Sequence, residues 1–331
     1  MRIEGWHRAL DQQMEYHKWC LSNTGTLYNY MFFGDVLDRI TAGMPDHTDG
    51  LNAQASVHLH KVLTETLWRA DTLFVTSDMM HILMQAAHDL PADAEFDEHV
   101  LITPNGFCLF EEPIIGVDRH DKKILFHGIA WSKQMINRSD SPDVVGDRGM
   151  GLIIFFLVDP TDPLDDYNHE YLDLLREKNV SIPPLSLQHF YPTRFGRTVF
   201  TDDPEMNVSG TRIVEETLKL FIAMQLIAQQ KIGEPVRMRP DRATRRRYER
   251  EYGENERLIT LITLRRKSVK KDDEEPQKVE WSRRWAVQGH WRRQYYSKSK
   301  THDYVYIHSY IKGPEDKPLV LSDRRVFNFA R

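Results

Sequence analysis

The spacing of apolar residues changes along this chain from a helical repeat to an alternating one, and this change limits the folds that the chain can adopt. Residues 52–70 place their apolar side chains at helical spacing among polar ones. A second helix is predicted to begin at Ser77, as its cap, and to end before Pro91, because serine caps helices and proline cannot continue them. These patterns predict a helical N-terminal part.

After the first hundred residues, the apolar residues come in short runs that are typical of strands. Residues 100–110, 124–131 and 152–158 are such runs, and turn-forming residues separate them. They predict a small central sheet, mixed or antiparallel. Residues 159–210 are rich in proline and turn residues, and we predict a long irregular connection there.

The clearest helix of the chain is Thr211–Ile232, which has a broad apolar face and is followed by Gly233. We predict that it lies in the core. A basic helix, Asp241–Tyr252, and a strand, Arg257–Arg266, are predicted next, and Trp281–Ile311 is predicted to form a hairpin. The predicted fold class is α+β: a helical N-terminal part, a central sheet, a long core helix and a C-terminal β-hairpin unit.

The net charge of −5 conceals two parts of opposite sign. Residues 237–331 hold 25 Lys and Arg against 14 Asp and Glu, a net charge of +11, whereas residues 1–236 carry −16. We therefore predict an acidic α+β body over residues 1–236 and a basic helix plus hairpin region over residues 237–331. Such a split indicates either a nucleic-acid-binding segment on an acidic body or two parts that attract each other.

The cysteines and the apolar stretches indicate the compartment. Cys20 and Cys108 are the only cysteines and form no C-x-x-C pair, so we expect neither a disulfide scaffold nor a thiolate zinc site. No signal peptide is recognisable, and no apolar stretch approaches the roughly 20 residues of a membrane helix. We expect a cytoplasmic protein with no membrane partner.

No cofactor and no metal are predicted. On a helix, His58 and His60 would point apart. The carboxylates that follow residue 158 are better interpreted as a solvated, proline-broken loop than as a metal site.

The hairpin is the most informative segment for function. Alternation predicts an apolar face, packed on a core, made of Trp281, Trp285, Val287, Trp291, Val305, Ile307 and Ile311. The opposite face would carry Arg284, His290, Arg292, Tyr296, Tyr304, Tyr306, His308, Tyr310 and Lys312. Bases could stack on that face while its cations contact phosphates. Alternatively, these rings are half-buried sheet residues that the acidic body covers.

The basic helix adds a second cationic feature. Arg242, Arg246 and Arg250 recur every four residues and so share one helix face. The other charges are predicted to pair within the helix, Arg245 with Glu249 and Arg247 with Glu251. The arginine row suits phosphate contacts, although such a run is more often only a solvated helix face.

The C-terminal run WAVQGHWRRQYY…YVYIHSYIKGPEDKPL contains a G-H-W-R-x-Q motif followed by a K-G-P-E turn. In this signature the chain resembles a family of actinobacterial, plasmid and actinophage proteins. The stretches ADTLFVTSDMMHILMQAAHDLP, PNGFCLFEEPI and RPDRATRRRYER are also similar to that family, so the resemblance covers nearly the whole chain. It implies a bacterial or phage cytoplasm and an accessory role, and it transfers no activity and no catalytic residue.

Three functions fit these patterns. We favour a nucleic-acid-binding accessory or regulatory protein, acting on RNA or DNA through Arg242, Arg246, Arg250, Arg284, His290, Arg292, Tyr304, Tyr306, His308, Tyr310 and Lys312. The second is a phage or plasmid interaction module that binds a host protein through its acidic front. The third is a metal-independent ribonuclease or toxin-like enzyme that uses His290, Arg292, Tyr306 and His308 for proton transfer and charge stabilisation. No motif specifies a reaction, so we favour binding over catalysis.

Overall fold

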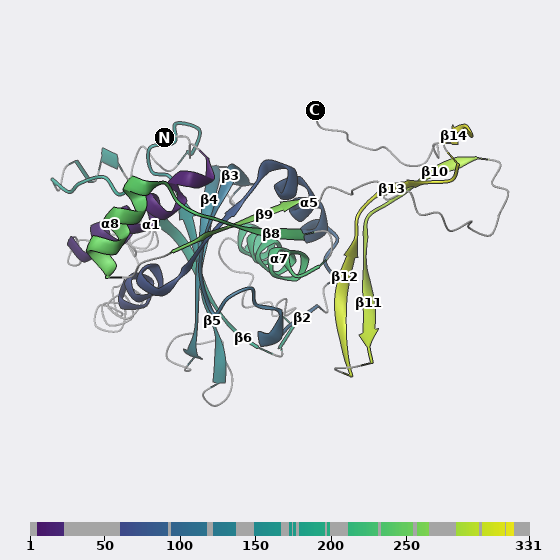
Figure 1. Ribbon diagram of the computed structural model, residues 1–331, viewed down its shortest axis with the longest axis horizontal. Coiled ribbons are helices and arrows are strands. Elements are labelled where there is room, and N and C mark those ends of the chain that lie inside the picture. Colours follow the sequence, from purple (N-terminus) through teal and green to yellow (C-terminus); the bar gives the residue numbers. More distant parts are fainter. Residues whose placement is uncertain are drawn as a thin grey trace, which may run out of the picture.

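A seven-stranded sheet forms the centre of the protein (Figure 1). In sheet order its strands are β6 (Ser186–Arg194), β5 (Gly149–Val158), β4 (Lys123–Ile136), β3 (Asn105–Val117), β1 (Asp71–Val75), β9 (Ile259–Leu264) and β8 (Gly233–Met238). The computed structural model describes residues 5–22, 60–91, 94–117, 122–136, 149–166, 172–173, 175–176, 179–195, 197–198, 211–230, 233–253, 257–264, 283–297, 300–314 and 316–320.

The sheet is mixed. Strand β1 runs parallel to both of its neighbours, β3 and β9, while the pairs β3–β4, β4–β5, β5–β6 and β8–β9 are antiparallel. The predicted α+β class is confirmed, and the sheet is larger than the small one expected. Of the two neighbours of β1, β3 precedes the long helix in the chain and β9 follows it. The sheet therefore joins distant parts of the sequence.

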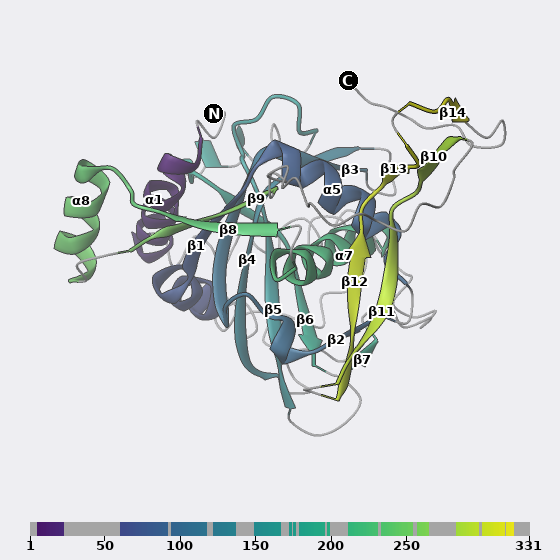
Figure 2. The same ribbon diagram turned by 45° about the vertical axis from the view of Figure 1, so that its right-hand side comes forward.

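Helices cover both faces of the sheet, as Figures 1 and 2 show. Helices α5 (Ser77–His88) and α7 (Thr211–Ala228) pack on the face that includes Leu73 and Val75 of β1. Helix α1 (Ala9–Ser22), the helix at residues 60–69, and α8 (Arg242–Tyr252) pack on the face that includes Phe74. Successive residues of a strand point to opposite faces, so β1 contributes to both cores.

Helix α7 lies in the core, as predicted, and ends at Ala228 rather than Ile232. The ring of its residue Phe221 is fully buried and meets Trp131 of β4 edge-on, with ring centroids 5.4 Å apart. Trp131 is also fully buried, and its indole N–H donates to the carbonyl of Thr103 over 2.9 Å. These rings fix how α7 sits on the sheet.

The start of α5 differs from the prediction. Thr76, not Ser77, is the N-cap residue, and its side chain makes no capping hydrogen bond. The carboxylate of Glu111, on β3, accepts hydrogen bonds from both the backbone N–H and the hydroxyl of Ser77. A tertiary contact therefore caps this helix, and a local sequence pattern cannot reveal such a contact.

Several strands were not predicted, among them β1, β6 and β8. Strand β6 lies within the region expected to be irregular, and β8 follows α7 directly. The division proposed between residues 236 and 237 falls inside β8, which pairs with β9 in the central sheet. The change in charge along the chain thus does not coincide with a break in the sheet, because β8, α8 and β9 belong to the same packed unit as the acidic part.

The predicted C-terminal hairpin is divided into two units. Strands β11 (His290–Tyr296) and β12 (Thr301–Ile307) form an antiparallel hairpin. Strands β10 (Arg284–Val287), β13 (Tyr310–Lys312) and β14 (Leu319–Val320) form a separate small sheet. Trp281 lies outside the described residues.

The remaining described elements are short. They are the 3-10 turns η1 (Trp6–Arg8) and η2 (Glu98–Val100) and the paired strands β2 (Glu95–Phe96) and β7 (Arg197–Thr198). Cys20 and Cys108 are buried free thiols, and burial raises the pKa of each. Within the ranges given above, no helix has the length and apolar character needed to span a bilayer.

Candidate nucleic-acid interface

The β11–β12 hairpin rests against the body through one of its faces. Trp291 and Tyr306 lie directly opposite each other on the two strands, with ring centroids 5.1 Å apart. Tyr306 belongs to the core cluster of α5 and α7, and Trp291 and Tyr304 pack against that cluster. The indole N–H of Trp291 donates to the carbonyl of Ala86 in α5 over 2.7 Å.

Two further contacts hold the edge of β12. The amide of Gln230 donates to the carbonyl of Tyr304 over 3.1 Å and accepts from the N–H of Tyr306 over 3.0 Å. One glutamine side chain thus satisfies two backbone groups of β12. His99, in η2, lies 2.9 Å from a carboxylate oxygen of Asp303. The hairpin is therefore a fixed part of the fold and not a loose arm.

The predicted position was wrong for Tyr304 and Tyr306. Tyr306 is only 4% exposed, and Tyr304 is half-buried. Directly paired residues on antiparallel strands share a face, so the pairing of Trp291 with Tyr306 places both rings toward the core. His290 and Arg292 pair with Ile307 and Val305 and therefore lie on the opposite face. Neither Tyr304 nor Tyr306 can be part of an open stacking platform.

The hydroxyl of Tyr306 lies in a restricted environment. It is buried without a hydrogen-bond partner among the residues that the structure describes. A Cβ atom at Gly289 would lie 2.3 Å from its oxygen, so a larger residue at that position would force the Tyr306 ring to move. Burial, and next the carboxylate of Asp89, raise the pKa of Tyr306 to about 12.

We expect Tyr306→Phe to keep or slightly increase stability near pH 8, by up to about 1 kcal/mol, because an unpaired buried hydroxyl is costly. The folded state holds the phenol proton more tightly than the unfolded state, whose pKa is near 10, so wild-type stability falls as the pH rises from 10 through 12. The variant lacks this ionisable hydroxyl and should therefore lose less stability than the wild type between pH 8 and pH 11. Urea unfolding at pH 8 and pH 11 measures both effects.

Tyr310→Phe, on the exposed ring of β13, is the matched control and should unfold like the wild type at both pH values. If Tyr306→Phe were less stable than the wild type by the same amount at pH 8 and at pH 11, the hydroxyl would instead make a stabilising hydrogen bond.

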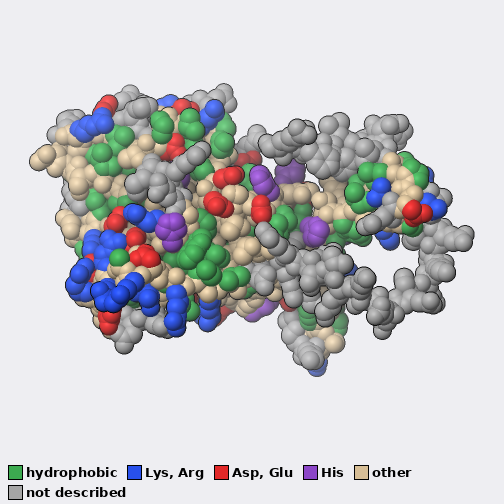
Figure 3. Space-filling model, turned by 45° about the horizontal axis from the view of Figure 1, so that its top comes forward, with side chains coloured by type: hydrophobic (Ala, Val, Ile, Leu, Met, Phe, Trp, Pro, Cys, Tyr) green, Lys and Arg blue, Asp and Glu red, His purple; other side chains and the backbone are tan. Residues whose placement is uncertain are grey.

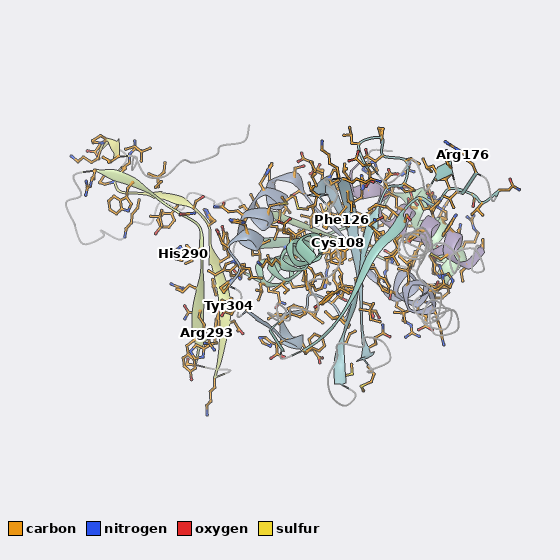
Figure 4. The ribbon with its side chains drawn as sticks, turned by 180° about the vertical axis from the view of Figure 1, so that it is seen from behind. Cys108, Phe126, Arg176, His290, Arg293 and Tyr304 are labelled. Atoms are coloured by element: carbon orange, nitrogen blue, oxygen red, sulfur yellow. The ribbon has the colours of Figure 1, made fainter. Side chains whose placement is uncertain are left out.

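The half of the hairpin nearer its turn is cationic and carries exposed rings. Arg292, Arg293 and Lys300 are exposed and form no ion pair with any described residue. Figure 4 shows His290, Tyr304 and Arg293 following one another toward the turn. The exposed rings near the turn are Tyr295, Tyr296 and His302, and the Tyr295 and His302 ring centroids lie 4.9 Å apart.

Acidic residues are scarce on the hairpin. Residues 290–307 contain four Lys and Arg residues and one carboxylate, Asp303. Because His99 contacts Asp303, that carboxylate is engaged at the body. We name the exposed residues around the hairpin turn the distal hairpin surface: Arg293, Tyr295 and His302 on the face that carries Tyr304, Arg292 and Tyr296 on the opposite face, and Lys300 at the turn. Sequence reasoning included only Arg292 and Tyr296 of this set.

The small sheet separates three of the predicted contact residues from the hairpin. Arg284 has a structural role, since its Nε donates to the carbonyl of Lys317 over 2.8 Å. The ammonium of Lys312 lies 5.9 Å from the centroid of the Trp285 ring, and Tyr310 is 41% exposed. The predicted platform is therefore not one continuous surface, because β10 and β13 belong to a small sheet separate from the β11–β12 hairpin.

Helix α8 is fastened to α1 along one side. Asp241 caps it by accepting from the N–H groups of Ala243 and Thr244. The hydroxyl of Thr244 donates to Asp11 of α1 over 2.9 Å, and Arg247 pairs with Asp11 and Glu15. The helix pairs predicted within α8 were wrong for Arg247, because carboxylates of α1 are the partners of that arginine.

The predicted arginine row faces outward. Arg242, Arg246 and Arg250 are all exposed. Arg250 lies 3.7 Å from Glu251, while Arg242 and Arg246 form no ion pair within the described part of the chain. Figure 3 shows Lys and Arg side chains gathered at the end of the molecule where α8 lies.

The residues of the ribonuclease hypothesis do not come together on one face. His290 and Arg292 share a face of the hairpin, and Tyr306 lies buried on the other. His308 follows β12, and its Nδ1 lies 2.7 Å from the carbonyl oxygen of Ser309. These side chains therefore do not place a general acid and a general base on either side of one bound substrate.

The carboxylates after β5 hold the backbone and a histidine. Asp165 accepts from the N–H of Leu125 over 2.8 Å, and Asp162 lies 3.0 Å from Nε2 of the buried His127. Asp159 accepts from the N–H and the hydroxyl of Thr161. In the described ranges, no three His, Cys, Asp or Glu side chains are placed to hold a metal ion together.

Comparisons with known proteins provide little guidance. No protein-family model matches this chain, and no curated protein matches it. Among solved structures, the crystal structure of AcrVA2 is similar at 13% sequence identity and a TM-score of 0.37, over 92% of this chain and 93% of that chain. A similarity of this size supports no argument about function.

Proposed function

We propose that this protein binds nucleic acid through the distal hairpin surface, in an accessory or regulatory role. The observation that carries the proposal is that Arg293 shares a hairpin face with the exposed rings of Tyr295 and His302, while Arg292 is exposed on the other face and Lys300 at the turn. The one nearby carboxylate, Asp303, is engaged by His99. Cations without acidic partners contact phosphates, and exposed rings stack on bases.

The anchoring of the hairpin supports the same proposal. Trp291, Tyr306 and Gln230 hold the part of the hairpin nearest the body. The distal side chains are therefore presented on a fixed backbone, which lowers the entropy lost on binding. Each base stacked on a protein ring contributes about 1–3 kcal/mol. The resemblance to plasmid and actinophage proteins supports an accessory role, and the buried free thiols are consistent with a reducing cytoplasm.

A salt titration of binding tests this function. We expect wild-type protein to shift short single-stranded DNA or RNA in a gel at low salt and to lose affinity steeply as salt rises. The double variant Arg292→Ala, Arg293→Ala should bind more weakly and reduce the slope of log K against log salt by about 1.4, because each lost phosphate contact lowers it by about 0.7 on single strands.

Arg176→Ala is the matched control, because Arg176 is an exposed arginine of the body that pairs with Asp173 (Figure 4). It should bind like the wild type. Absent binding, or binding that does not change with salt, would reject the proposal. Retention of one host protein by nuclease-treated beads, without any gel shift, would indicate the protein-interaction function instead.

A further inference from the structure

A second exposed cationic surface lies away from the hairpin. Three arginines of α8, Arg242, Arg246 and Arg250, point outward in a row, and Glu249 is the one exposed carboxylate of the helix. Arg237 of β8, the strand that leads to α8, is exposed as well. We name Arg237, Arg242, Arg246 and Arg250 the α8 surface. It carries cations and no exposed aromatic ring.

The helix that carries this surface is held rigidly. Thr244 and Arg247 bind carboxylates of α1, and the ring of Tyr248 is buried in the core beside Tyr252. Lys18 of α1 pairs with Glu251 over 2.7 Å. Both neighbouring carboxylates of α1, Asp11 and Glu15, are used by Arg247, so they are not placed to neutralise the outward row.

The α8 surface and the distal hairpin surface lie on opposite sides of the central sheet. Tyr248 of α8 belongs to the core on one face of the sheet, and Tyr306 of the hairpin belongs to the core on the other. Figures 1 and 2 show the two elements at opposite ends of the protein, with the sheet and its helices between them. A short ligand bound at one surface does not reach the other.

We propose that the α8 surface is a second polyanion site and that the protein bridges two nucleic-acid segments. This inference rests on the proposed function of the hairpin. The two surfaces differ in chemistry, since the hairpin offers rings and cations while α8 offers cations alone. The α8 surface therefore contacts phosphates without reading bases. The segment held there can be a duplex or a single strand.

A two-step capture experiment tests bridging. Beads carry a biotinylated poly(dT) strand of about 15 nucleotides, the scale of one binding site. They are loaded with full-length protein, washed, and then offered a fluorescent DNA of the same length, either single-stranded or duplex. We expect the wild type to retain the fluorescent DNA. The double variant Arg242→Gln, Arg246→Gln should still load onto the beads through the hairpin but retain about fivefold less of the second DNA, because two phosphate contacts are lost.

The conservative variant Arg242→Lys, Arg246→Lys should retain the second DNA, since a lysine keeps the charge that a phosphate contact needs. Arg176→Gln controls for the loss of an exposed arginine elsewhere. Equal retention by the Gln double variant and the wild type would overturn the inference, because bridging would then occur without the α8 surface.

The two proposals fail in different ways. If the wild type loads onto the beads but retains no second DNA, the α8 surface does not bridge, whereas the function of the hairpin stands. If the wild type does not load at all, nucleic-acid binding by the hairpin fails, and the bridging inference fails with it. If Arg292→Ala, Arg293→Ala abolishes loading while the α8 variant does not, the two surfaces act separately, as proposed.

Discussion

We expect Phe221→Ala to lower the free energy of unfolding by about 3–5 kcal/mol, the range for large-to-small changes in a packed core. The ring of Phe221 is fully buried between Trp131 of β4 and Phe96 of β2, with ring centroids 5.4 Å and 5.8 Å away. Removing it leaves a cavity between α7 and the sheet and also removes two aromatic contacts. Urea unfolding monitored by circular dichroism measures the change.

Two controls bracket this expectation. Phe221→Leu keeps most of the buried volume and should cost clearly less. Met84→Ala changes a side chain of α5 that is 45% exposed, and its effect should stay within about 1 kcal/mol. If Phe221→Ala and Met84→Ala had equal effects, α7 would not be packed on the sheet as described.

Gly106→Ala is expected to have the second-largest effect, a loss of about 3 kcal/mol, at the upper end of the range for overpacking. A Cβ atom at Gly106 of β3 would lie 2.1 Å from the indole ring of Trp131 on the neighbouring strand. Trp131 is fully buried and held by its hydrogen bond to Thr103, so the ring cannot move aside easily. Thermal and urea unfolding of the purified variant measure the loss.

Gly253→Ala separates backbone strain from collision. Gly253 ends α8 with φ of 72°, and no atom lies within 4 Å of a Cβ placed there. Its substitution should cost only the strain of a left-handed alanine, about 1–2 kcal/mol. If Gly106→Ala lowered the stability no more than Gly253→Ala does, this result would contradict the close contact between β3 and Trp131.

Helices α7 and α8 were predictable because their signals are local. The apolar face of α7 and the Asp241 cap of α8 are readable over a few residues, and both helices occur where they were predicted. Two of the missed strands, β6 and β8, contain Pro192 and Pro235. Proline weakens a strand prediction, but both strands lie at the edges of the sheet, where a missing N–H costs little.

The candidate site was harder to predict, because the face of a hairpin residue depends on register. The turn between Tyr296 and Thr301 sets that register and pairs Trp291 with Tyr306. A period-two pattern alone cannot choose which face meets the body, and a shift by one residue reverses the assignment. The length of this turn was the signal in the sequence that could have placed Arg293 on the same face as Tyr304.

The position of β1 in the sheet has a consequence for synthesis of the chain. Thr72 pairs with Phe107 on one side and with Ile259 on the other. At roughly 5–20 residues per second, a ribosome needs roughly 10–40 s to reach the second partner after making β1. During that interval one edge of the central strand lacks its neighbour, so chains that stop before residue 259 would expose an open strand edge and tend to aggregate.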